Sequence, residues 1–154
     1  MNTVRRLARR FGRCVRGSAT VEAALVVPFM LSIGLGAAEA GAMVSETHKM
    51  KAGLAAGARL LARAQDPPSL EADARNLAVT GQRSGGAPRV PGWTSAQVTV
   101  SYRWVSNSSG DYTGGSSIRI VRLQSAKPYR GLGLLSLFAG NQITASHEER
   151  WTGG

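Results

Sequence analysis

The stretch that decides the fold is RGSATVEAALVVPFMLSIGLGAAEAGA, which runs from Arg16 to Ala42. The first sixteen residues of the chain contain six arginines and no acidic residue, and residues 23–38 contain no charge at all. Glu22 stands at the start of this apolar run. A carboxylate inside a bilayer costs on the order of 2.5–3.5 kcal/mol on insertion scales. The sequence therefore indicates a membrane-spanning helix with one carboxylate that needs a partner.

Cleavage of the chain after Gly17 would supply that partner. Ser18 would become the N-terminal residue, and its α-amino group, with a reference pKa of about 7.7–8.0, would be largely protonated at neutral pH. The amine could neutralise Glu22 of its own chain or of a neighbour. Ser18 and Glu22 are four residues apart, so a helix places them on one face, near the end where the macrodipole favours an anion.

These residues carry a resemblance to a known family. A basic leader, Gly17, the small residue Ser18, Glu22 and an apolar helix together resemble the processing signal of type IV pilins and pseudopilins. The segment GSATVEAALVVPFML, followed by a helix of small residues and by AGARLLAR, resembles the TadE-like group over roughly residues 16–64. Those proteins are minor pseudopilins of the tight-adherence (Flp-type, type IVb) pilus machinery. Ala23 departs from the pattern, because many members carry an aromatic residue after the Glu.

The resemblance implies a structural function for the chain. An intramembrane prepilin peptidase would read Gly17, Ser18 and Glu22, and the processed subunit would take part in assembly of a pilus used in adhesion or secretion. The implied partners are the inner membrane, the prepilin peptidase, and pilin and other pseudopilin subunits or pilus assembly proteins. The arginines beside the span keep the N-terminus in the cytoplasm by the positive-inside rule. The C-terminal part would then be extracytoplasmic, in the periplasm or in the pilus.

Four segments follow from charge, hydropathy and helix breakers. They are a basic cytoplasmic leader at 1–17, a transmembrane helix at 18–45, an extracytoplasmic extension of that helix at 46–65 and a small extracytoplasmic α+β domain at 66–154. The second segment exceeds the about 20 residues that a spanning helix needs. The helix should end near Arg63, before the breaker Asp66-Pro67-Pro68.

Several residues of the long helix are candidates for packing. Pro28 predicts either a bend that lets the helix pack in a filament or an ordinary proline of a membrane helix. The small residues Gly34, Ala38 and Gly41 predict close approach of a partner helix. Glu39 is expected to reach the headgroup region. Further along, an apolar seam recurs at helical spacing and predicts the surface on which the small domain packs: it consists of Met50, Leu54, Ala58 and Leu61.

The remaining chain predicts a short helix and three antiparallel strands. Ser69 is expected to cap the helix, which would run through about Val79. The strands are expected at Ala96–Val105, Ile118–Ser125 and Gln142–Trp151, because apolar and polar residues alternate there. Val98, Val100, Tyr102 and Trp104 form the half-buried face of the first strand. The fold class is therefore α+β.

The apolar run LGLLSLF, from Leu132 to Phe138, allows two interpretations. It is too short to span a bilayer. It either covers the small core or forms an exposed patch that contacts a pilus subunit or an outer-envelope component.

No enzyme, cofactor or metal is predicted. The sequence has no phosphate loop and no nucleophile elbow, and neighbouring strand residues alternate in direction, so His147 with Glu148 and Glu149 is expected to make a poor dyad. With only two histidines and the single Cys14, a structural zinc site and an intrachain disulfide are excluded. The net charge of +10 falls to +4 without residues 1–17, which leaves 13 basic and 9 acidic residues, so nucleic-acid binding is not expected.

Two other hypotheses remain open. The basic n-region and apolar run also fit a signal peptide, with a signal-peptidase site near Ala40 or Ala42 that would release a secreted globular domain. Alternatively the chain is an uncleaved single-span envelope protein, which would retain Cys14.

Overall fold

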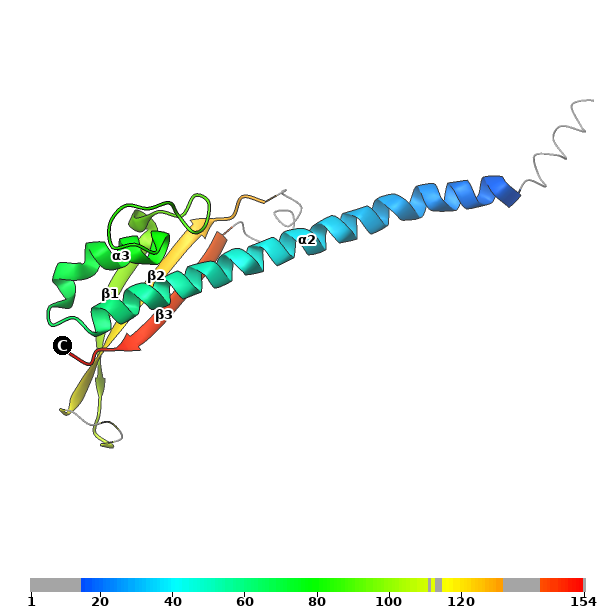
Figure 1. Cartoon of the computed structure of the whole chain (residues 1–154). Coiled ribbons are helices and arrows are strands. Elements are labelled where there is room, and N and C mark those ends of the chain that lie inside the picture. The colour runs from blue at the N-terminus through cyan, green and yellow to red at the C-terminus, as the bar shows by residue number, and fades with distance from the viewer. Residues whose placement is uncertain (1–14, 111, 113–114, 132–141, 154) are drawn as a thin grey trace, which may run out of the picture.

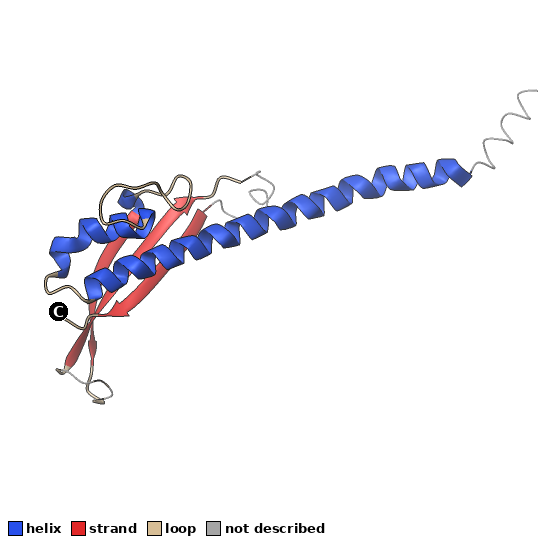
Figure 2. Cartoon of the chain, in the orientation of Figure 1, coloured by secondary structure: helices blue, strands red, loops and turns tan. Residues whose placement is uncertain are grey.

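The computed structural model describes residues 15–110, 112, 115–131 and 142–153, with side chains from residue 19 onward. A long helix α2 (Val15–Ala62) is followed by a 3-10 turn (Pro67–Leu70), helix α3 (Glu71–Thr80), a second 3-10 turn (Ser95–Gln97) and strands β1 (Val98–Ser106), β2 (Ser117–Pro128) and β3 (Gln142–Arg150). Half of α2 projects from a small domain in which α2 and α3 cover one face of the sheet (Figures 1 and 2). The predicted α+β fold class is confirmed.

The sheet is a meander in which the strand order β1-β2-β3 follows the sequence. Both pairings are antiparallel. Strand β1 begins two residues later than predicted, because a capping box between Thr94 and Gln97 closes the turn before it. Strand β2 continues three residues beyond Ser125, where it pairs with the first residues of β3. Lys127 therefore becomes an inward-facing strand residue, which the sequence pattern did not predict.

The apolar seam of α2 is confirmed as the centre of the core. Met50, Leu54, Ala58 and Leu61 are all 0% exposed. They pack with buried residues of the sheet and with Trp93 in one cluster. The indole of Trp93 donates a hydrogen bond to Ser125 Oγ over 2.9 Å, which satisfies the one polar atom that this large side chain brings into the core.

Two glycines that the sequence analysis passed over bring α3 against α2. A Cβ at Gly57 would come within 2.6 Å of the Ala74 carbonyl oxygen and 2.8 Å of Leu123 Cδ2. A Cβ at Gly53 would overlap the Ala78 carbonyl oxygen. Small residues at i and i+4 on both helices, Gly53 and Gly57 on α2 and Ala74 and Ala78 on α3, let the two backbones touch.

The prediction that Ser69 caps the second helix is wrong. Helix α3 begins at Glu71, and no side chain caps it. The Ser69 hydroxyl instead donates to the Asp66 carbonyl over 2.8 Å, within the 3-10 turn that the two prolines begin. Proline fixes φ near −65° and lacks an N–H, which suits the first positions of such a turn and shifts the α-helix later.

The apolar side chains of the β1–β2 hairpin are less buried than the alternation of apolar and polar residues in β1 predicted. Val98 is buried and Tyr102 half-buried as expected, but Trp104 is 65% exposed. Figure 1 shows the hairpin extending beyond the C-terminal end of α2, so no helix lies over its tip. The expectation of burial for Trp104 is therefore wrong, although the residue lies on the predicted face.

Candidate functional site

The N-terminal half of α2 is an apolar surface that no described part of the chain covers. From Ala19 to Ala38 the helix is exposed almost throughout, with Leu25 at 74% and Phe29 at 68%. Twenty residues at about 1.5 Å each give about 30 Å, the thickness of the hydrocarbon core of a bilayer. The helix is long and apolar enough to cross a membrane. An apolar surface of this extent needs lipid or other subunits around it.

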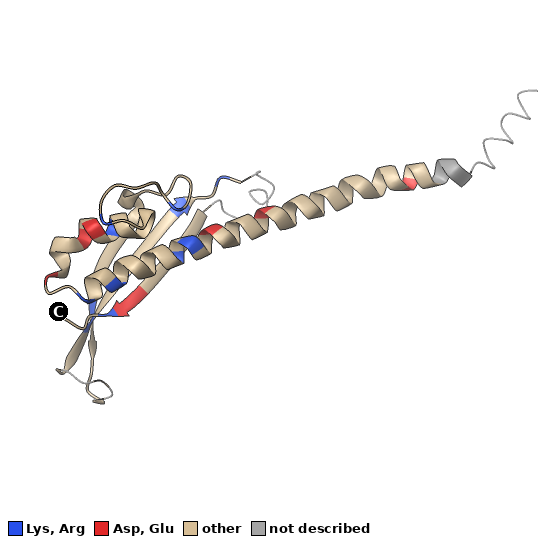
Figure 3. Ribbon diagram, viewed as in Figure 1, with Lys and Arg blue, Asp and Glu red and all other residues tan. Residues whose placement is uncertain are grey.

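Glu22 is the one charged residue of this exposed stretch. Figure 3 shows that the projecting half of α2 is almost entirely without charged residues. Gly17 and Ser18 lie in the first turns of α2, which begins at Val15, so Ser18 precedes Glu22 by about one helical turn. The backbone therefore places the predicted new N-terminus and the carboxylate on one helix face, as the spacing indicated.

Helix α2 is unbroken at Pro28. Proline has no N–H, so it gives the carbonyl one turn earlier no hydrogen bond. One turn later, Ser32 Oγ donates to the Pro28 carbonyl over 2.9 Å. A bend or a melted turn at Pro28 inside a filament stays a prediction.

The predicted packing residues Gly34, Ala38 and Gly41 are open on the described part of the chain. A Cβ at Gly34 or Gly41 would meet no heavy atom within 4 Å. Ala38 is exposed. These positions are therefore available to another helix, whereas the small residues used inside the chain are Gly53 and Gly57.

Glu39 marks the boundary between the exposed half and the domain. It is 4% exposed, so the domain covers this side chain, and its expected position at the headgroup region stays a prediction. The segment after β2 covers it: Tyr129 Oη donates to the Glu39 carbonyl over 3.2 Å, and Gly131 lies against its carboxylate. Burial, and then the negative charges of Glu39 and Glu46, raise the pKa of Tyr129, which keeps its phenol a donor.

A cluster on β3 corrects the expectation for His147. Glu148 points to the other face, where it accepts from Arg103 over 2.8 Å. Glu149 is two residues from His147, so the alternation of the strand places both on one face, with Nε2 and Oε1 3.0 Å apart; the expectation that this pair has poor geometry is wrong. Arg59 of α2 also donates to Glu149 over 3.2 Å. The three side chains join the edge of the sheet to the helix.

These carboxylates predict a fall in stability in acid. The hydrogen bond from His147 lowers the pKa of Glu149, and the hydrogen bond from Arg103 lowers that of Glu148. A carboxyl whose pKa is lower in the folded state stabilises the fold above its unfolded pKa of about 4.3, and this stability is lost as the pH falls through the folded pKa. We expect the urea midpoint to fall between about pH 5 and pH 3. Glu149→Gln should reduce the fall of the urea midpoint with decreasing pH.

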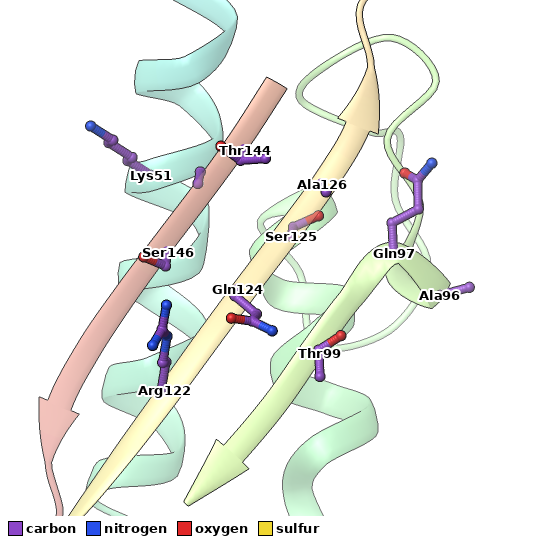
Figure 4. Close-up of a pocket in the computed structure, with 11 residues that line it drawn as sticks. Lys51, Ala96, Gln97, Thr99, Arg122, Gln124, Ser125, Ala126, Thr144 and Ser146 are labelled. Atoms are coloured by element: carbon purple, nitrogen blue, oxygen red, sulfur yellow. The ribbon is translucent and has the colours of Figure 1, made fainter. Parts of the chain in front are cut away.

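The outer face of the sheet carries an open depression of about 760 Å³. Figure 4 shows that polar side chains from all three strands line it, among them Thr99, Arg122 and Thr144. Its lining contains no carboxylate, histidine or cysteine, so it holds no acid–base pair. Within the described part of the chain, no three His, Cys, Asp or Glu side chains gather to hold a metal ion. The predicted roles of Leu132–Phe138 lie outside the described residues.

Comparison with known proteins identifies the N-terminal segment. Residues 17–59 match the model of the family described as TadE-like protein. No curated protein matches the chain. No solved structure matches it either. The matched segment contains Glu22, the exposed half of α2 and most of the apolar seam, and it ends before α3 and the sheet. Residues 17–59 are therefore a TadE-like segment, which confirms the resemblance to the TadE-like group.

Proposed function

We propose that this chain is a pseudopilin-like structural subunit that is anchored in the inner membrane by Ala19–Ala38 and takes part in assembly of a tight-adherence pilus. The observation that carries the proposal is the uncovered apolar helix of bilayer length with its single carboxylate, in a segment that matches the TadE-like family. That family points to a pilus-associated subunit. The role is structural rather than enzymatic.

In this proposal a prepilin peptidase cuts after Gly17. The amine of Ser18 then neutralises Glu22, either in the same helix or in a neighbouring pilin or pseudopilin helix. The uncovered small residues Gly34, Ala38 and Gly41 allow close helix packing, which is the usual use of small residues between membrane helices. The N-terminus faces the cytoplasm and the domain faces the periplasm, as the arginines of the leader favour.

The structure gives a reason to prefer this proposal to release by signal peptidase. Residues 39–42 lie inside α2, and Glu39 is buried under Tyr129 and Gly131. Cleavage near Ala40 or Ala42 would cut the helix at this contact and remove a buried side chain from the domain. A cut after Gly17 lies far from the domain and leaves every contact of the core intact.

The test is the mature N-terminus, measured by mass spectrometry of the chain from its native membrane. We expect a chain that begins at Ser18. A chain that begins near Gly41 or Met43 would overturn the proposal in favour of a secreted domain. An intact Met1 would contradict processing and leave a plain membrane anchor.

Glu22→Leu tests the role of the carboxylate in assembly. Loss of the charge pair should reduce the number of pili on the order of tenfold or more, since each 1.4 kcal/mol is about a factor of ten in an equilibrium. The control is Leu25→Ile in the same exposed stretch, which should leave pilus number unchanged. Normal piliation and normal subunit crosslinking in Glu22→Leu would contradict the charge-neutralisation mechanism.

A further inference from the structure

We propose that the globular domain rests directly on the outer surface of the bilayer, with Tyr129 and Arg130 in the phospholipid headgroup layer. This inference rests on the proposed membrane anchorage, and it adds a lipid-contacting surface and a fixed position for the domain. The partner is the phosphate of the headgroups, held by the guanidinium of Arg130.

The first step is the absence of a spacer between the apolar stretch and the domain along α2. The exposed stretch of bilayer length ends at Ala38, and the next residue, Glu39, is already 4% exposed. If residues 19–38 fill the hydrocarbon core, the domain begins to contact the helix within the first turn outside it. A domain held on a spacer of several turns would leave those turns exposed.

The second step identifies what covers Glu39. After β2 the chain runs along α2 toward its exposed half, as Figure 1 shows. Tyr129 Oη donates to the carbonyl of Glu39 over 3.2 Å, which fixes the phenol at the level where the apolar stretch ends. Tyrosine is enriched at membrane–water interfaces, because its ring is apolar and its hydroxyl polar. Arg130 follows in sequence and is exposed.

The third step concerns how firmly this end of the domain is held. Lys127, which is 3% exposed, donates to Glu46 over 2.8 Å and to the Pro91 carbonyl over 2.9 Å. Together with the Tyr129 hydrogen bond, these contacts attach the end of β2 to α2 at two positions, Glu46 and Glu39. The domain therefore keeps Arg130 close to the end of the apolar stretch. A guanidinium in that position forms paired hydrogen bonds with a phosphate.

The experiment measures membrane depth with the full chain in vesicles. In a Cys14→Ser background, single cysteines at Leu31, Gln142 and Ser108 carry a fluorescent label. Lipids brominated near the headgroup quench the labels at Gln142 and Ser108, and lipids brominated deep in the acyl chains test the label at Leu31. Gln142 pairs with Pro128 beside the proposed contact, and Ser108 lies in the far hairpin. Because α2 continues 24 residues beyond Ala38, about 36 Å, we expect at least about threefold stronger quenching at Gln142 than at Ser108.

The label at Leu31 separates this inference from the proposed function. Quenching at Leu31 and Gln142 but not at Ser108 supports the surface contact. Quenching at Leu31 alone would overturn the surface contact and leave membrane anchorage intact. An unquenched Leu31 would contradict both.

A charge variant tests the phosphate contact. Arg130→Glu should reduce quenching at Gln142 by at least about twofold, because like charges repel at the headgroup layer. Arg63→Glu makes the same change in charge at the exposed far end of α2, and it should leave the quenching unchanged. The contact is expected in phosphatidylcholine alone and with phosphatidylglycerol added, since both lipids carry the phosphate. Equal quenching in Arg130→Glu and in the unmodified chain would overturn the role of Arg130.

Discussion

Replacing both Gly53 and Gly57 by alanine is expected to lower the free energy of unfolding by about 1–3 kcal/mol, the range found for overpacked cores. The groups that a methyl would meet are the backbone carbonyls of Ala74 and Ala78, which cannot rotate away as a side chain can. Helix α3 would have to move outward as a unit. That movement would open the core around Trp93, whose Cη2 lies 3.1 Å from the methyl position at Gly53.

Helix propensity acts against this loss, and the control separates the two effects. Alanine is better than glycine in a helix interior by up to about 1 kcal/mol. Gly34→Ala and Gly41→Ala gain this propensity without a clash, because nothing lies within 4 Å of either position. Urea unfolding of the full chain in mild detergent, followed by tryptophan fluorescence, compares the pairs. Equal stability of the Gly53/Gly57 and Gly34/Gly41 alanine variants would contradict the inference that α2 and α3 are in close backbone contact.

The sequence predicted the parts of the fold that depend on local pattern. The seam of α2 repeats at helical spacing, and the three strands alternate with a period of two, so both could be read without knowing their partners. The sequence did not predict a role for Gly53 and Gly57, because a glycine within a helical pattern indicates only a lower helix propensity. What gives these glycines a function is the backbone of α3 packed against them, with Ala74 and Ala78 more than fifteen residues away in the chain.

The errors in the sequence analysis share a tertiary cause. The second strand was predicted to end at Ser125, whereas the strand continues to Pro128 with Lys127 buried. Lys127 is tolerated there because Glu46, 81 residues earlier, reaches it. Nothing local in the sequence indicates that Tyr129 and Gly131 cover Glu39, because this contact joins residues about ninety positions apart in the chain. For the candidate site, the local signal around Gly17 and Glu22 was readable, whereas the surface at Tyr129 and Arg130 exists only after folding.

Glu46→Leu is expected to destabilise the chain by about 3–5 kcal/mol, the cost of removing one partner from a buried ion pair. Lys127 Nζ lies 2.8 Å from Glu46 Oε2, and the Lys127 side chain is only 4% exposed, so water cannot replace the carboxylate. The Pro91 carbonyl would remain as its acceptor within the described residues. Lys127→Met should cost less, about 1–2 kcal/mol, because Glu46 is 22% exposed and can be hydrated.

The double variant Glu46→Leu/Lys127→Met distinguishes an ion pair from simple packing. It removes both charges and keeps apolar volume, so its stability should return to within about 1 kcal/mol of the unmodified chain. Arg103→Gln breaks the exposed pair with Glu148 and should cost less than about 1 kcal/mol. Urea unfolding of these variants and of the unmodified chain gives the coupling free energy between Glu46 and Lys127. Additive losses in the double variant would show that the two side chains do not act as a pair. The same variants bear on the proposed membrane contact, because among the described residues the Tyr129 hydrogen bond to the Glu39 carbonyl also ties the segment after β2 to α2.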